Sequence, residues 1–159
     1  MSDQTALSEA QHKQCALELN KLTWKWLDLH DRTEDQDRLM IHAAHGSCFH
    51  WSRAGGGVQQ QRGEWLVARV YAVLEHPEAA LYHARRCMEF TEAHKAELKD
   101  FDLAYAQEGL ARALAAAGLK DEARSHFVQA QILGDKIADP EDRKIFQNDF
   151  AADPWYGLR

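Results

Sequence analysis

The residues with the clearest potential for chemistry are the histidines of segment 34–53, His42, His45 and His50. Two histidines three positions apart on a helix can bind one metal ion. On a helix, however, His50 points about 140° away from His45 and lies about 12 Å along the axis from His42. No glutamate completes a His-Glu-x-x-His arrangement. We therefore predict that this segment binds no metal by itself and that its histidines form hydrogen bonds or line a groove.

A second candidate pairs His83 with Cys87, which lie four positions apart and could form an activated thiol on one helix face. Cys87 also lies where a small apolar residue is needed for two helices to pack, and a buried thiol is unreactive because its pKa is raised. We therefore predict a structural role for Cys87, and for Cys15 and Cys48 on apolar helix faces. The sequence predicts no catalytic residue, metal or cofactor.

The spacing of apolar residues predicts an all-α protein of about seven helices, because no stretch alternates apolar and polar residues long enough for a strand. The predicted helices cover about 8–30, 33–53, 60–74, 77–95, 100–117, 119–137 and 140–150. The whole chain, 1–159, is expected to be one domain. It divides into a pair of helices at 8–53, repeat-like hairpins at about 60–95 and 100–137, and a last helix at 140–150.

Capping signals set the ends of these helices. Ser8 with Gln11, and Thr33 with Gln36, form capping boxes. Gly55-Gly56-Gly57 is expected to end the second helix, with residues 58–61 as a polar lead into the third. Further signals are Pro77 at a first helical position, Asp100 as a cap, Gly118 as a left-handed stop and Asp139-Pro140 as a start. Residues 153–156 are expected to fray unless their aromatic side chains dock.

The first predicted helix has two apolar stripes. Cys15, Leu19, Leu22, Trp26 and Leu29 form one stripe, and Leu17, Trp24 and Leu27 form the other. A helix that is apolar on two sides must bury both. We predict a homodimer with Leu17, Trp24 and Leu27 at or near the contact. The alternative is a monomer in which the second and last helices cover both stripes.

Two copies of one helical hairpin cover Arg62 to Ala130, with a constant offset of about 43 residues. The matching positions are Ala68, Tyr71, Ala80 and Cys87 in the first copy and Ala111, Leu114, Ala123 and Ala130 in the second. Together with Val67, Leu110 and Phe127, this pattern resembles a divergent tetratricopeptide repeat with longer helices. We predict that Ala68, Tyr71, Ala80, Ala111, Leu114, Ala123 and Phe127 are buried within their hairpins.

The resemblance implies a right-handed stack of hairpins in which the first helix of each hairpin lines a concave ligand groove. Carried over by position, the groove residues are Arg62, Trp65 and Arg69, then Tyr105, Glu108 and Arg112, with His42, His45 and Arg53 as an extension. Arginines suit carboxylate and phosphate groups, so Arg69 and Arg112 would hold an anionic group beside Trp65 and Tyr105. The alternative is that Glu108 pairs with these arginines as a structural contact.

The composition limits the partners. The formal net charge of −6 argues against nucleic acids and anionic membranes as general partners. No segment is apolar enough to span a bilayer. Three separated cysteines without a Cys-x-x-Cys pair, and no secretory signal in Met1–Gln4, favour a cytoplasmic protein.

The resulting hypothesis is a non-enzymatic binding module for a protein or peptide segment or a small anionic ligand. One alternative is a helical enzyme or metal-dependent sensor that uses the histidine face of the second helix. A further alternative is a purely structural homo-oligomer.

Overall fold

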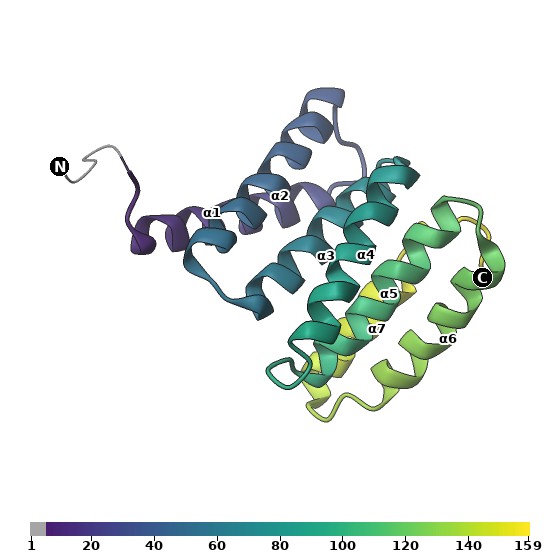
Figure 1. Cartoon of the computed structure of the whole chain (residues 1–159). Coiled ribbons are helices and arrows are strands. Elements are labelled where there is room, and N and C mark those ends of the chain that lie inside the picture. Colours follow the sequence, from purple (N-terminus) through teal and green to yellow (C-terminus); the bar gives the residue numbers. More distant parts are fainter. Residues whose placement is uncertain (1–5) are drawn as a thin grey trace.

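Seven helices make up the computed structural model, which describes residues 6–159 (Figure 1). Their bounds are α1 Glu9–Leu27, α2 Glu34–Ala54, α3 Gly57–Val73, α4 Pro77–Ala93, α5 Asp100–Ala116, α6 Lys120–Asp135 and α7 Pro140–Ala151. No strand occurs in the described range. This confirms the all-α prediction with seven helices. The expectation about a secretory signal concerns Met1–Gln4, which lie outside the described residues.

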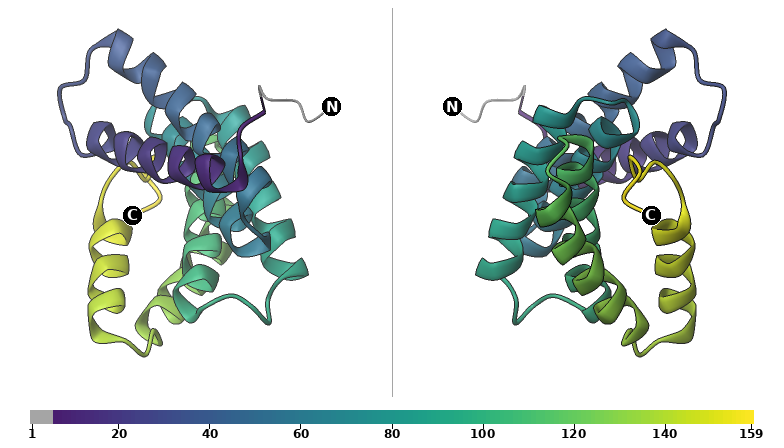
Figure 2. Two further views of the ribbon diagram at one scale, coloured as in Figure 1. Left: turned by 90° about the vertical axis from the view of Figure 1, so that its left-hand side faces the viewer. Right: turned by 90° about the vertical axis from the view of Figure 1, so that its right-hand side faces the viewer.

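Neighbouring helices pack in three pairs, α1 with α2, α3 with α4, and α5 with α6 (Figure 1). Contacts of α2 with α3, and of α4 and α3 with α5, join one pair to the next. The last helix, α7, packs on α5 and α6. In Figure 2, α1 and α7 lie on the same side of the α3–α5 layer, with the C-terminal tail between them.

Most helix ends follow the predicted chemistry. Ser8 and Thr33 form the two capping boxes, Pro77 opens α4, and the Asp139 carboxylate accepts from two amides at the start of α7. Gly118 has φ of 79°, as expected for a left-handed stop. The fifth helix differs, because Lys99 is its N-cap and Asp100 is its first residue.

The glycine-rich segment differs from the prediction. Gly57 is the first residue of α3, and the Gln59 side chain accepts the amide of the N-cap Gly56 at 2.9 Å. Residues 58–61 are therefore helical and not a polar lead. Gln61 is buried and donates to Thr91 and to the carbonyl of Asp102. The side-chain cap begins the helix within the glycine run that sequence alone assigns to a break.

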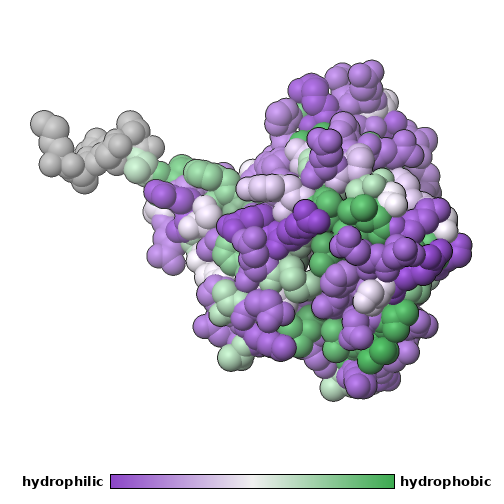
Figure 3. All heavy atoms as spheres, turned by 45° about the vertical axis from the view of Figure 1, so that its right-hand side comes forward, coloured by the Kyte–Doolittle hydropathy of each residue, from purple (hydrophilic) through white to green (hydrophobic). Residues whose placement is uncertain are grey.

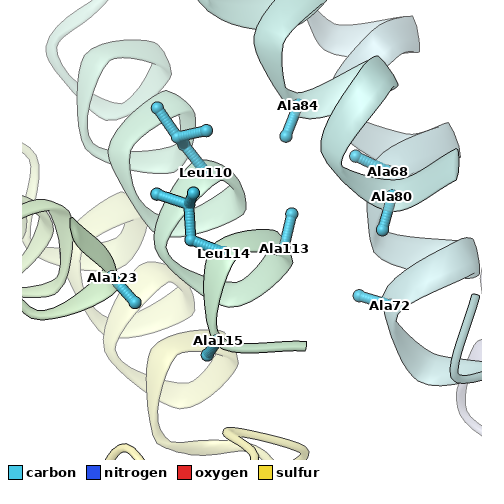
Figure 4. Close-up of a cluster of buried hydrophobic side chains, with 9 residues drawn as sticks. All are labelled: Ala68, Ala72, Ala80, Ala84, Leu110, Ala113, Leu114, Ala115 and Ala123. Atoms are coloured by element: carbon cyan, nitrogen blue, oxygen red, sulfur yellow. The ribbon is translucent and has the colours of Figure 1, made fainter. Parts of the chain in front are cut away.

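Small residues form the core between the second and third pairs. Figure 4 shows Ala68, Ala72, Ala80 and Ala84 facing Leu110, Ala113 and Leu114, with Ala123 behind them. Five residues predicted to be buried are so, namely Ala68, Ala80, Ala111, Leu114 and Ala123. Tyr71 and Phe127 are half-buried. Alanines at these positions let the helix axes approach closely.

The C-terminal tail docks on the helices. Trp155 is buried, donates its indole N–H to the carbonyl of Phe150, and packs its ring against Phe127. The Tyr156 hydroxyl donates to the carbonyl of Ala72 on α3. The tail was expected to fray unless its aromatic side chains dock, and both Trp155 and Tyr156 do dock.

The second apolar stripe of α1 is covered in part by α3. Trp24 stacks on Trp65 with ring centroids 5.8 Å apart, and Leu27 packs with the same cluster. Leu17 remains 43% exposed.

Elsewhere, apolar side chains reach the surface in small patches among hydrophilic ones, as Figure 3 shows for one face. None of the helices in residues 6–159 has the length and apolar character needed to cross a membrane.

Candidate functional site

A groove of about 470 Å³ opens between α1, α3, α5 and α7, and we call it the central groove. Its lining combines six apolar or aromatic side chains with six polar or charged ones: Asn20, Trp24, Asp28, Gln61, Arg62, Trp65, Leu66, Phe101, Asp102, Tyr105, Ile145 and Asp149. On α1 these residues recur every four positions, and on α7 they are also four apart. One face of each helix therefore forms a wall.

The floor of the central groove is aromatic. Trp65 stacks on Trp24 and meets the edge of Tyr105, with centroids 5.0 Å apart in the second pair. Trp65 also lies directly over Gly109 of α5, where a Cβ atom would come within 2.9 Å of its Cδ1 atom. A glycine at this position is therefore what lets the indole lie against the α5 backbone.

Glu108 fixes the position of Trp65 from beneath. Its Oε2 accepts the Trp65 indole N–H at 2.8 Å. Its Oε1 accepts from Arg112 at 2.6 Å and from Arg69 at 3.3 Å. Glu108 is 0% exposed and Arg112 is 1% exposed. Both oxygens of this buried carboxylate are therefore occupied by protein donors, which satisfies the charge that burial would otherwise penalise.

Arg112 is buried and uses four of its five N–H donors within the chain. Besides Glu108, it donates to the carbonyls of Ala152, Pro154 and Asp149 at 2.8, 2.7 and 3.2 Å. Its guanidinium lies 4.0 Å from the centroid of the Trp155 ring. Burial lowers the pKa of Arg112 to about 10, while the Glu108 carboxylate favours its charged form. Arg112 is therefore a protonated link between α5 and the C-terminal tail.

The third arginine predicted for the groove, Arg62, is also paired. Its Nε and a terminal nitrogen donate to the two Asp102 oxygens at 2.8 and 2.9 Å, a bidentate arrangement. Its guanidinium lies 5.1 Å from the centroid of Phe101. The expected anionic ligand would have to compete with carboxylates that already hold Arg62, Arg69 and Arg112. The geometry therefore agrees with the alternative in which Glu108 pairs with the arginines.

Comparisons with protein-family models, curated proteins and solved structures find no match for this chain. Its site is therefore interpreted from its own geometry.

The predicted groove residues separate into two groups in the structure. Arg62, Trp65 and Tyr105 line the central groove, and Arg69, Glu108 and Arg112 form the charged cluster beside it. The proposed extension lies elsewhere. His42 and Arg53 are exposed on α2, and His45 faces α3 and α4 instead of the groove.

His45 belongs to a separate polar cluster. Its Nε2 lies 2.8 Å from the Tyr71 hydroxyl, and its ring centroid is 5.2 Å from that of His83. His83 bonds Glu64 at 2.6 Å, so its partner is a carboxylate and not the Cys87 thiol. Burial, and then the charge of His83, lower the pKa of His45. Within residues 6–159, no group of three or more histidine, cysteine, aspartate or glutamate side chains is arranged to hold a metal ion.

Burial also sets the state of two cysteines. It raises the pKa of the Cys87 thiol and raises that of Cys48 to about 12. Both thiols are therefore protonated near neutral pH, which agrees with the structural role predicted for them.

Sequence reasoning missed the walls of the groove. Trp24 was assigned to a dimer contact, and Asp28, Ile145 and Asp149 were assigned no role, yet all four line the central groove. The four-residue spacings on α1 and α7 were visible in the sequence. Nothing local, however, indicates that the first and last helices face each other across α3 and α5.

Asp149 connects the central groove to a second hollow of about 340 Å³. Both are lined by Trp24, Asp28 and Asp149, and the adjoining hollow extends to Arg69 and Asp153. One oxygen of Asp149 accepts the Tyr105 hydroxyl at 2.6 Å. Burial raises the pKa of Asp149, against the opposing effect of this hydrogen bond and of Arg69.

Proposed function

We propose that this chain is a non-enzymatic binding module of the tetratricopeptide-like, helical-repeat kind, which takes up a peptide segment of a partner protein in the central groove. The observation that carries the proposal is an open groove whose aromatic floor is held in place from beneath. Trp65 is fixed by Glu108 and by its close approach to Gly109. A preformed apolar site lowers the entropy lost on binding.

The chemistry of the lining favours a peptide over a small anion. Most of the accessible surface of the lining is apolar, as in grooves that accept apolar side chains. The arginines are held by carboxylates of the chain itself, so an anion gains little there. The groove borders four helices, which gives a partner segment contacts along its length.

A displayed library of random peptides tests the proposal. The library is selected on the wild-type protein, and the enriched peptides are then measured on the Trp24→Ala variant. Trp24 is half-buried and lines the groove, so its removal is expected to weaken binding at least about tenfold. Tyr82→Ala is the matched control, because Tyr82 is an exposed aromatic residue on α4 outside the groove.

The expected result is a set of peptides that bind the wild type and the control alike and lose affinity for Trp24→Ala. Thermal unfolding of the three proteins checks that the variants are folded. A library without enriched peptides, or peptides that bind all three proteins equally, would overturn the proposal.

A further inference from the structure

The charges that remain without an ion-pair partner in the central groove are both negative. Arg62 and Asp102 hold each other, and Arg69 is held by Glu108. Asp28, at the C-terminal end of α1, and Asp149, on α7, also line the groove. Within residues 6–159, neither carboxylate lies within ion-pair distance of a cationic side chain, although Arg69 and Arg112 act on Asp149 through space. The charged groups of the groove that have no ion-pair partner are therefore carboxylates.

The protein already contains two examples of how a cation is held beside this groove. Arg62 is held by the Asp102 carboxylate and the face of Phe101, and Arg112 by the Glu108 carboxylate and the face of Trp155. Each guanidinium thus combines an ion pair with an aromatic surface, and both contacts favour a cation over a neutral group. Asp149 and Asp28 line the groove with Trp24 and supply the same two elements, carboxylates and an aromatic ring, with no ion pair to a cationic side chain of residues 6–159.

The shape of the site allows such a cation to belong to a longer segment. The central groove and the adjoining hollow share Trp24, Asp28 and Asp149. A cationic group of a ligand placed at these shared residues leaves space for the rest of the ligand in the central groove and in the adjoining hollow. On the central side the lining includes the apolar side chains of Leu66, Phe101 and Ile145. A side chain with an apolar stem and a charged tip matches this arrangement.

We propose that the partner segment carries a lysine or arginine, flanked by apolar residues, whose cationic group binds between Asp28 and Asp149 while its stem lies on Trp24. This inference rests on the proposed function, since it names the chemistry of the peptide that the same groove selects. It replaces the anionic group expected from sequence with a cationic one.

The peptides enriched on the wild-type protein test this inference directly. The variant Asp28→Asn/Asp149→Asn keeps the shape of both side chains and an acceptor for the Tyr105 hydroxyl, but removes both charges. Asp28→Asn alone is a second variant at an exposed position that does not take part in packing. The control is Asp121→Asn/Glu122→Gln, which removes the same net charge at two exposed positions on α6.

We expect lysine and arginine to be enriched over aspartate and glutamate in peptides whose binding needs Trp24. Their affinity should fall about tenfold in the double groove variant and remain within about twofold in the control. A peptide in which norleucine replaces the basic residue should bind more weakly than the original peptide. Its affinity should be the same for the wild type and for Asp28→Asn/Asp149→Asn. Peptides that need Trp24 but show no basic enrichment, or ignore Asp28 and Asp149, would overturn this inference and leave the binding module standing. Peptides that do not need Trp24 would overturn the module itself.

Discussion

Glu108 carries a buried negative charge and contacts two arginines and an indole. One substitution can remove this charge while keeping the shape of the side chain. Glu108→Gln keeps the size of the side chain but leaves Arg112 and Arg69 without their shared carboxylate. We expect the free energy of unfolding to fall by about 3–5 kcal/mol, because an uncompensated buried charge remains. Chemical denaturation measures the change.

The matched control for this prediction is Glu122→Gln on α6. Glu122 is exposed, so the same chemical change should alter the free energy of unfolding by no more than about 0.5 kcal/mol. Equal effects of the two substitutions would contradict the central role of Glu108.

Asp149 should make the stability of the fold depend on pH, with its contribution largest at low pH. Burial raises its pKa in the folded protein above the unfolded value of about 3.9. The folded state then binds more protons than the unfolded state between these two pKa values, so the contribution of Asp149 to stability falls as pH rises through that window. Asp149→Asn is expected to remove this contribution. Unfolding curves of both proteins from about pH 3 to pH 7 measure the difference, and a constant difference across that range would argue against it.

At the scale of single residues, sequence identified several correct positions and, as one alternative, the pairing of Glu108 with Arg69 and Arg112, but not the other acceptors of Arg112. The i, i+3 and i+7 spacing placed Arg62, Trp65 and Arg69 on one helix face, and the same spacing joined Tyr105, Glu108 and Arg112. The acceptors that hold Arg112 come from residues about forty positions later, in a segment whose docking depends on tertiary contacts. The repeat spacing therefore predicted that Arg112 binds a ligand, whereas its guanidinium donates to acceptors of the chain itself.

At the scale of helices, the close packing of small residues gives a second test. Ala111 and Ala123 are both 0% exposed, so a larger side chain would have to displace its neighbours. Replacing either with leucine is expected to lower the free energy of unfolding by about 1–3 kcal/mol through overpacking. Thermal or chemical unfolding measures the loss. Ala117→Leu, at the exposed end of α5, should unfold like the wild type. If both core variants unfold at the same temperature or denaturant concentration as the wild type, this account of the hairpin contacts is contradicted.

Most helix ends were predictable because they have local signals. Caps at Ser8, Thr33 and Asp139 and the stop at Gly118 depend on nearby residues, and the structure agrees with them. The start of α3 was not predictable in the same way. Glycine is unfavourable inside a helix, but Gly57 stands at its first turn, where the Gln59 side chain and the burial of Gln61 compensate.

At the scale of the whole molecule, the homodimer stays a prediction. Two of its three proposed residues, Trp24 and Leu27, pack within the chain, and Leu17 is the exposed one. Light scattering at micromolar concentration gives the mass. If the mass is that of a dimer, Leu17→Glu should reduce it toward that of a single chain, because a buried carboxylate opposes an apolar contact. A single-chain mass for the wild type would reject the dimer.

The two walls of the central groove come from opposite ends of the described chain, α1 and α7, and this has a consequence for synthesis. The helices that supply its floor can pair with their neighbours as they leave the ribosome, because their contacts are local in sequence. The wall carrying Ile145 and Asp149, and the carbonyls that hold Arg112, are made after these helices. A nascent chain interrupted before these residues has the floor of the groove without its second wall. In the proposed binding module, we therefore expect partner binding only after translation has passed residue 154, so that incomplete chains do not occupy the partner.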